Sequence, residues 1–213
     1  MFRRYRHYEP GEFIVVGVDT AWTGTDYVTG QFISQTNRDQ VSVYHTNKVS
    51  MTIGTQALHQ ELEKIYDTTK VKPVIAIETN NGGEGWIEIM NLLNKQGKYH
   101  IYRRKKFEGT IHQTEESDSY GFTTNAATRP RMLGDLKEAI DANLIVLPDK
   151  PTVTELFSFI INKRGKPEAE VGAHDDLIMA LAIAWQLFQT ERPPSVKIRR
   201  QTRTQKRSSF HVT

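Results

Sequence analysis

The sequence of 213 residues contains no cysteine, which excludes disulfide bonds, thiol catalysis and thiolate zinc sites. Any bound metal ion must therefore have oxygen or imidazole ligands, and this donor set favours Mg²⁺ or Mn²⁺. The sequence also lacks a run of about 20 apolar residues, the length needed to cross a bilayer, and its first residues lack the apolar segment of a secretory signal. We expect a soluble protein with no membrane partner.

Acidic residues are missing from the end of the chain. The last 22 residues, 192–213, contain seven Lys or Arg and no Asp or Glu, so that a formal net charge of +3 for the whole chain leaves −4 on residues 1–191. A basic segment that also contains proline and serine is typical of a disordered tail. The sequence predicts one folded domain at 1–191 and a basic, disordered tail at 192–213.

Two apolar runs each end in a carboxylate. The run "FIVVGVD" ends at Asp19 and the run "VIAIE" ends at Glu78, and both have the composition of buried strands. A carboxylate at the end of a buried strand is costly to desolvate unless a cation or hydrogen-bond donors stabilise it. Asp19 could be a turn residue before "AWTGTD", where Gly24 and the threonines offer local hydrogen bonds. The alternative is that Asp19 binds a ligand.

The order of the predicted elements indicates an α/β fold. The expected elements are, in order, three antiparallel strands within 12–47, a helix at 51–70, a strand at 72–80, a helix at 82–97 closed by Gly97, a strand at 98–105, a polar loop at 107–128, a helix at 129–144, a strand at 144–148, a short helix followed by a hairpin or a turn within 150–173, and an apolar helix at 173–189. Asp175 and Asp176 lie in the first turn of that last helix. This order resembles the ribonuclease H-like plan, a mixed central sheet flanked by helices.

In such a plan Asp19, Glu78 and Asp176 can converge on one point. Like charges within about 4–6 Å repel and raise one another's pKa, so a cluster of carboxylates is best explained by divalent cations. Two ions about 4 Å apart are the usual apparatus of in-line phosphodiester attack. The pair Asp175 and Asp176 has a second explanation, because aspartate is a favoured N-cap that complements the helix dipole.

Three segments, "VVGVDTAWTGTDY", "VIAIETNNGG" and "GAHDDLIMALAIAW", resemble the nuclease domain of the large terminase subunit of tailed bacteriophages. The resemblance spans about residues 12–190; its most specific element is "HDDL" at the start of an apolar helix, and the glutamate in "IETN" is similar to the T4-like variant. It implies a ribonuclease H-like fold and divalent-metal-dependent DNA endonuclease activity with a two-ion site for Mg²⁺ or Mn²⁺. The implied metal ligands are Asp19, Glu78, Asp176, Asp175 and Asp26, of which the first three are also the implied catalytic residues.

The chain has no phosphate-binding G-x-x-x-x-G-K-[ST] loop, whereas a complete large terminase subunit carries an ATPase motor before the nuclease. We therefore expect an isolated nuclease domain that cuts packaged viral DNA and does not translocate it. The resemblance implies double-stranded DNA as substrate, the ATPase domain of the same parent chain, the portal and the small terminase subunit as partners, and the host cytoplasm as location. No base-reading motif is present, so we expect little sequence specificity.

Basic and polar residues on two segments are candidates for contact with DNA phosphates. One segment is the end of the strand at 98–105 together with residue 106, and the other begins the helix at 129–144, where N–H and guanidinium groups suit a phosphate. The candidates are Arg103, Arg104, Lys105, Lys106, Asn125, Arg129 and Arg131. An ordinary solvent-exposed surface is the alternative for each. His174, beside the acid pair, could orient a carboxylate or bind a phosphate.

Three other functions fit parts of the sequence. A different ribonuclease H-like enzyme, such as a junction resolvase, an integrase or a ribonuclease H, would share the chemistry but not the substrate. The segment "DTAWTG" also resembles the first phosphate loop of actin-like sugar kinases and ATPases, although 213 residues leave little room for their second lobe. In a non-catalytic binding module the acids would only cap helices. Among these functions, only the nucleases require a divalent ion for DNA cleavage without a nucleotide.

Overall fold

The computed structural model describes residues 1–20, 27–80, 82–107, 114–157, 159–161, 167–169 and 174–193. Its strands are β1 (Phe2–Arg4), β2 (Ile14–Asp19), β3 (Val28–Ser34), β4 (Asp39–Thr46), β5 (Val74–Ile77), β6 (His100–Ile101), β7 (Arg103–Phe107), β8 (Thr114–Tyr120), β9 (Phe159–Ile161) and β10 (Pro167–Ala169). Its helices are α1 (Met51–Thr69), α2 (Gly83–Leu93), α3 (Thr128–Asp141), α4 (Lys150–Phe157) and α5 (Asp176–Thr190). Asp26 and residues 194–213 of the predicted tail lie outside the described residues, so the domain boundary at residue 191 stays a prediction.

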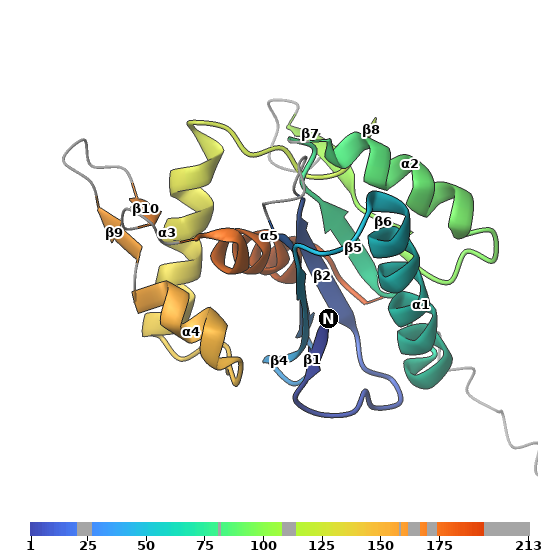
Figure 1. Ribbon diagram of the computed structural model, residues 1–213, viewed down its shortest axis with the longest axis horizontal. Coiled ribbons are helices and arrows are strands. Elements are labelled where there is room, and N and C mark those ends of the chain that lie inside the picture. Colours follow the sequence, from blue (N-terminus) through green and yellow to red (C-terminus); the bar gives the residue numbers. More distant parts are fainter. Residues whose placement is uncertain are drawn as a thin grey trace, which may run out of the picture.

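Six strands form the central sheet, in the order β1-β4-β3-β2-β5-β6. The strands β2, β3 and β4 are antiparallel neighbours, as the sequence predicts, and β5 and β6 continue the sheet parallel to β2. The sheet is therefore mixed: its antiparallel strands come first in the sequence, and helices connect them to the parallel strands that follow (Figure 1). The edge strand β1 was not predicted, because its three residues, "FRR", show neither apolar alternation nor turn residues on both sides.

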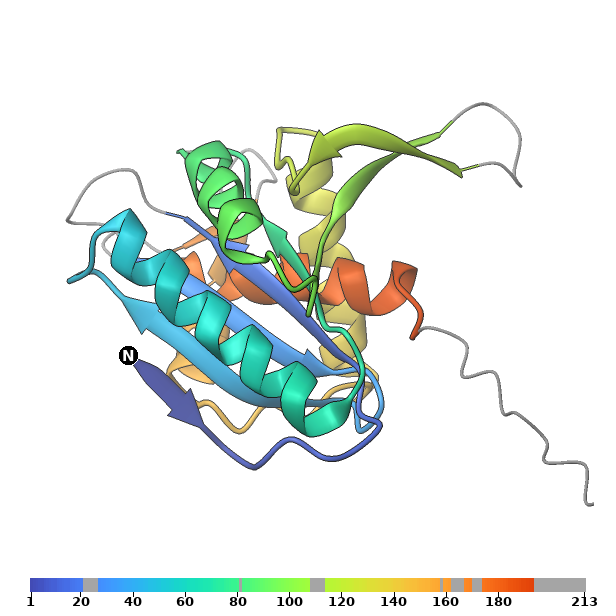
Figure 2. The same ribbon diagram turned by 90° about the vertical axis from the view of Figure 1, so that its right-hand side faces the viewer.

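Helices cover both faces of the sheet (Figures 1 and 2). On one face α1 and α2 pack through Leu58, Leu62 and Trp86 against β-strand side chains, and on the other face α3 and α5 enclose a second apolar cluster. The helix α5 lies unusually close to the sheet because β2 has a glycine beneath it. A Cβ at Gly17 would lie 2.2 Å from the Ala180 carbonyl oxygen, so any larger residue there would push α5 away from the strand that ends in Asp19.

The segment 98–128 departs most from the prediction. The single strand expected at 98–105 is divided, because β6 ends in the main sheet and β7 leaves it to pair with β8. The polar loop expected at 107–128 is therefore wrong in part, since 114–120 is a strand. Its sequence, "TEESDSY", has no apolar alternation because this two-stranded hairpin extends away from the core (Figure 2). The backbone register places Lys105 opposite Glu116 and Lys106 opposite Glu115.

One predicted helix boundary and one predicted strand are also wrong. The helix expected at 82–97 ends at Leu93, and Gly97 lies beyond it in a turn with φ of 60°. The strand expected at 144–148 is only an isolated bridge between Val146 and Asp39, because one pair of residues is all that reaches the end of β4. The helices at 51–70, 129–144 and 173–189, and the short helix and hairpin within 150–173, are confirmed as α1, α3, α5, and α4 with β9 and β10.

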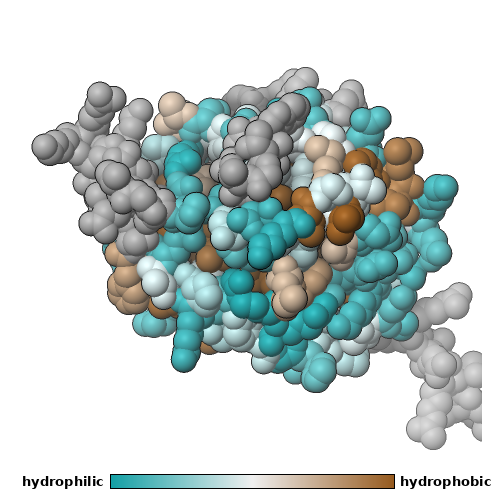
Figure 3. Space-filling model, in the orientation of Figure 1, coloured by the Kyte–Doolittle hydropathy of each residue, from teal (hydrophilic) through white to brown (hydrophobic). Residues whose placement is uncertain are grey.

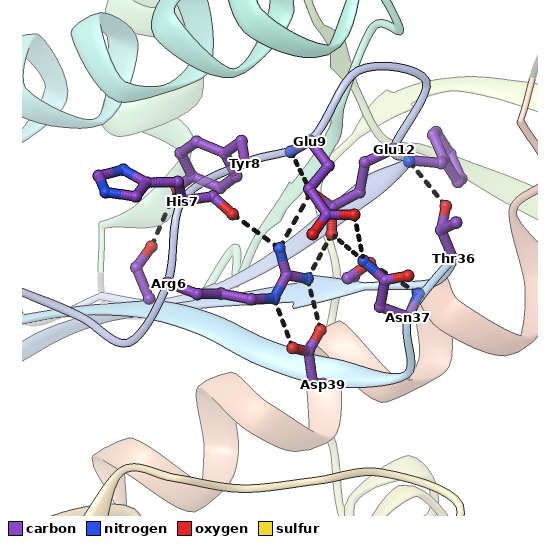
Figure 4. A network of polar contacts seen from close by, with 11 residues as sticks. Arg6, His7, Tyr8, Glu9, Glu12, Thr36, Asn37 and Asp39 are labelled. Atoms are coloured by element: carbon purple, nitrogen blue, oxygen red, sulfur yellow. Dashed lines mark hydrogen bonds and ion pairs between the residues drawn. The ribbon is translucent and has the colours of Figure 1, made fainter.

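A partly buried ionic network connects the amino-terminal segment to the start of β4 (Figure 4). Arg6 donates from Nε and Nη2 to the two carboxylate oxygens of Asp39, and it also pairs with Glu12. Glu12 is only 2% exposed, and it also accepts hydrogen bonds from Asn37 Nδ2 and from the Glu9 backbone N–H. The carboxylates at this end of the sheet are thus satisfied by cations and amides of the protein itself.

Hydrophilic side chains cover most of the face seen in Figure 3, with apolar ones in small groups between them. Exposed large apolar side chains include Ile53, Leu92, Val146 and Phe157. Among the described residues, no helix is both long enough and apolar enough to span a membrane.

Candidate active site

Asp19 and Glu78 end two neighbouring parallel strands at the same edge of the sheet. The register places Val18 opposite Ile77, and the Glu78 N–H donates to the Val18 carbonyl oxygen at 2.9 Å. Both carboxylates are buried, with 8% and 5% of each residue exposed. The predicted convergence of these two residues is therefore what the strand pairing produces.

The environment of Asp19 disfavours its charged form. Burial raises the pKa of Asp19 well above its usual range, and a hydrogen bond with Glu78 and the charges of Glu78, Asp176 and Asp175 raise it further. Two carboxyl groups can share a hydrogen bond only if one of them carries a proton. A cation at this position would remove that proton and relieve the repulsion, which is the behaviour expected of a set of ion ligands.

Asn80 holds Glu78 in place. Its Nδ2 donates to Glu78 Oε1 at 3.2 Å, to the Thr124 carbonyl oxygen at 2.7 Å and to Thr124 Oγ1 at 2.8 Å. The first residue of α2, Gly83, lies so close that a Cβ there would be 1.6 Å from the Glu78 carbonyl oxygen. Sequence analysis did not single out Asn80 or Gly83, although both follow Glu78 within the motif "IETNNGG".

The first turn of α5 brings the acid pair to the same place. The side chain of Asp176 is 19% exposed, and its Oδ2 lies 3.6 Å from His174 Nδ1. Asp175 occupies the N-cap position, but its side chain makes no capping hydrogen bond. Instead it forms an ion pair with Arg129 Nη2, on the first turn of α3. The explanation of the pair as an ordinary N-cap therefore lacks its defining contact, and Arg129, predicted to bind phosphate, lies at the edge of the carboxylate cluster.

Glu155 is a further carboxylate near the acid pair that sequence analysis missed. It lies on α4, and its Oε1 accepts a hydrogen bond from the Ile178 N–H at 2.9 Å. Burial raises the pKa of Glu155 to about 7; the Ile178 N–H opposes this rise, and the nearby charges of Asp176 and Asp175 add to it. No sequence motif marks Glu155, because its position follows only from the packing of α4 on α5.

Three aromatic side chains, Tyr27, His45 and His174, pack together beside Asp176. Tyr27 stacks on His45 with ring centroids 4.2 Å apart, and it meets His174 edge-on at 5.4 Å. Burial lowers the pKa of His45 to about 4, with Arg3 and the chain's amino-terminal ammonium group adding to the effect. The imidazole of His45 is therefore neutral at physiological pH, and Thr29 Oγ1 lies 2.8 Å from its Nδ1.

The chemistry of the donor set suits a hard divalent ion, because carboxylates predominate and one imidazole is adjacent. Within the described ranges, no three histidine, aspartate or glutamate side chains stand in an arrangement that could hold an ion as they are. Asp19 and Glu78 face each other, and Asp175 faces Arg129. Binding would therefore require side-chain rearrangement, in which Asp19 and Glu78 turn from each other toward the ion.

The other predicted DNA-binding residues lie in different settings. Arg104 is half-buried; its Nη2 donates to Thr79 Oγ1 at 3.4 Å, and among the described residues its buried Nε has no hydrogen-bond partner. Arg103 donates to the Tyr120 hydroxyl group at 2.6 Å, and Arg131 is exposed on α3. Asn125 has a structural contact, since its Oδ1 accepts the Ala127 and Thr128 N–H groups. The strand β7 carries Lys105 and Lys106.

The fold and the position of the carboxylates define the class: the chain has a ribonuclease H-like fold, with acidic residues at the ends of its central strands and on the final helix. Neither a protein-family model nor a curated protein sequence matches the chain. Solved structures do match it, and they confirm the predicted resemblance to large terminase nuclease domains.

The matching structures come from phages and a herpesvirus. The large terminase nuclease from thermophilic phage G20c with bound magnesium has a TM-score of 0.64 at 15% identity, with 87% of this chain and 86% of that one covered. The Thermus phage P74-26 domain has a TM-score of 0.60 at 16% identity, covering 90% and 87%. The manganese-soaked human cytomegalovirus terminase nuclease domain has a TM-score of 0.55 at 12% identity, covering 84% of each chain. At such identities the likeness shows the shared fold.

Proposed function

We propose that this chain is a divalent-metal-dependent DNA endonuclease of the large terminase type. The observation that carries the proposal is the buried pair Asp19 and Glu78, held against each other at the ends of parallel strands with Asp176 beside them. Burying such a cluster destabilises the folded protein, so its presence needs a compensating ligand. The shared fold with nuclease domains, one solved with magnesium and one soaked with manganese, supports a divalent ion as that ligand.

In this proposal Asp19, Glu78 and Asp176 hold the ions, with Asp175 and Asp26 as further ligands. Two bound Mg²⁺ or Mn²⁺ ions would supply an activated water for attack on the phosphodiester and stabilise the leaving oxygen. Asn80 would fix the orientation of the Glu78 carboxylate, because its Nδ2 donates both to Glu78 and to the Thr124 carbonyl oxygen.

Basic residues around the carboxylates are proposed to place the DNA backbone. Arg104 contacts Thr79, the residue after Glu78, and Arg129, on the first turn of α3, pairs with Asp175. Guanidinium groups suit phosphate because their N–H groups match its oxygens in a planar fork. We propose that Arg103, Lys105, Lys106, Asn125 and Arg131 add further backbone contacts, which would give affinity with little sequence specificity.

The biological setting is also a proposal. The chain would cut double-stranded viral DNA during genome packaging in the host cytoplasm, together with an ATPase domain of the same parent chain, a portal and a small terminase subunit. The shared fold with terminase nuclease domains supports this setting.

Incubation of supercoiled plasmid with the purified chain tests the activity. We expect nicking and linearisation with Mn²⁺ or Mg²⁺, none in EDTA, and cut positions scattered along the plasmid. Asp19→Asn should be inactive, whereas Asp67→Asn should cleave like the wild type, because Asp67 is an exposed residue of α1 that pairs with Lys98. A folded wild-type chain that leaves plasmid intact in every divalent ion, and at every DNA concentration, would refute the proposed function.

A further inference from the structure

The first turn of α5 is capped by a side chain from another helix, Glu155 of α4. A helix begins with N–H groups that have no partner within the helix, and the side chain at the N-cap normally accepts the N–H of the third residue. In α5 the N-cap is Asp175 and the third residue is Ile178. The Ile178 N–H donates to Glu155 Oε1 at 2.9 Å, whereas Asp175 makes no capping bond and faces Arg129.

A second contact holds the same turn by its carbonyl oxygen. Gln31, a fully buried residue of β3, donates from Nε2 to the Leu177 carbonyl oxygen at 3.1 Å and to Thr152 Oγ1 at 3.0 Å. Thr152 lies on α4, three residues before Glu155, and therefore on the same side of that helix. The helix α4 thus carries Glu155 and also contacts Gln31, the two side chains that hold the first turn of α5.

The helix α4 is itself anchored firmly. Asp149, just before it and fully buried, accepts the Thr152 N–H at 2.9 Å and a hydrogen bond from Arg3 Nε at 2.6 Å, and its own N–H donates to Gln40 Oε1 at 3.0 Å. Contacts from β1 and β4 therefore fix the position from which Glu155 reaches α5.

We propose that Glu155 is a positioning residue that caps α5 in place of Asp175, so that Asp175 keeps its ion pair with Arg129 and Asp176 keeps its place beside Asp19 and Glu78. Aspartate is among the strongest N-cap residues, and without an alternative acceptor Asp175 would turn back onto the Ile178 N–H. That turn would break its ion pair with Arg129 and would reorient the residue next to Asp176. The part of this inference that concerns activity rests on the proposed function, and the part that concerns capping does not.

A double-mutant cycle in thermal stability tests the exchange of caps. In the wild-type background Asp175→Ala removes an ion pair at a partly exposed site and should change the melting temperature by about 1 °C or less. In the Glu155→Ala background the same change removes the replacement cap and should lower the melting temperature by a further 2–4 °C, roughly. In the Glu155→Gln background, where a side-chain oxygen can still accept, Asp175→Ala should behave as in the wild type. Equal effects of Asp175→Ala in all three backgrounds would overturn the capping inference.

The metal dependence of DNA cleavage tests the effect on the site. Glu155→Ala should raise the Mn²⁺ concentration for half-maximal cleavage by about tenfold, because it disturbs residues that orient ligands. Glu155→Gln should restore that concentration to within about threefold of the wild type. If Glu155→Gln is as defective as Glu155→Ala, the charge of Glu155 acts directly on the ion or the DNA, and the positioning role is wrong. If the wild type does not cleave DNA, the proposed function fails, and the stability cycle still decides whether Glu155 caps α5.

Discussion

Buried carboxylates at opposite ends of the sheet have opposite surroundings. Glu12 is buried against Arg6, and although burial alone would raise its pKa, hydrogen bonds from Arg6, Ser34 and the Glu9 backbone hold that pKa below its usual value. Asp19 is just as buried, yet burial, a carboxyl partner and further acids raise its pKa. A buried carboxylate is thus paired with a cation where it holds the fold together, and it lies among other acids where we propose that it binds an ion.

Asp149 resembles Glu12, because it too is a buried carboxylate stabilised by an arginine. It is fully buried, and it accepts hydrogen bonds from Arg3, Tyr5 and Thr152. Burial would raise the pKa of Asp149, but these donors, Arg3 first, lower it to about 2. Removing a charge from Asp149 should therefore cost stability, whereas removing one from Asp19 should gain it.

The largest expected effect is on activity. Asp19→Asn, Glu78→Gln and Asp176→Asn should each lower the rate of plasmid cleavage at saturating Mn²⁺ by about a hundredfold or more, because loss of one ligand misplaces the reacting groups. Asp149→Asn should retain most of the wild-type rate at a temperature where it remains folded. Single-turnover cleavage assays measure both. Similar losses in the two groups would erase the distinction between the two classes of carboxylate.

The next effect is on stability. Asp149→Ala should lower the free energy of unfolding by about 3 kcal/mol, because it leaves Arg3 and the donors of Tyr5 and Thr152 without their acceptor. Chemical denaturation measured by circular dichroism checks this value. A loss below about 1 kcal/mol would mean that water or rearranged side chains replace Asp149 easily.

The contribution of Asp149 to stability should depend on pH, because its pKa is lowered in the folded state. Its pKa is about 2 in the folded state, below the ordinary value of 3.8, so its contribution is complete above pH 4 and is lost as pH falls toward 2. The expected size is about 2 kcal/mol. The wild type should therefore lose more stability than Asp149→Asn between pH 4.5 and pH 2.5. Parallel stability curves for the two proteins would contradict the assignment.

The smallest effect is a gain. In EDTA, Asp19→Asn should melt a few degrees higher than the wild type, because a desolvated and repelled carboxyl is replaced by an amide of the same shape. Saturating Mn²⁺ should raise the melting temperature of the wild type by binding only the folded state, and it should raise that of Asp19→Asn much less. Calorimetric scans with and without the ion check both statements. Identical melting of the two proteins under both conditions would exclude a shared ion site.

The parts of the fold with a core-facing pattern were predictable from sequence. Apolar periodicity predicted α1, α5 and the buried strands, and it placed Asp19 and Glu78 at strand ends because β2 and β5 are continuous apolar runs. The hairpin of β7 and β8 was missed because it forms a separate two-stranded sheet and its sequences, "RRKKF" and "TEESDSY", have no apolar alternation. The bridge at Val146 was mistaken for a strand because an apolar run does not reveal how much of it reaches a partner.

The candidate site was predictable only in its acidic residues. Asp19, Glu78 and the acid pair stand out by type and position, but the contacts that hold them come from elsewhere in the chain. Asn80 reaches Thr124, and Glu155 reaches Ile178, through packing between elements that are separate in sequence. Such partners carry no local signal, because any polar residue in a short loop or helix looks the same until the fold places it.

The close contact between Gly17 and α5 also has a consequence for the timing of assembly. The strand β2 is made long before α5, so their packing is a contact of very long sequence separation. Such contacts form late in folding, after the loop entropy between the partners has been lost. A nascent chain can build the antiparallel half of the sheet long before Asp176 emerges from the ribosome. We therefore expect that chains interrupted before α5 is made, even when partly folded, have no assembled carboxylate site.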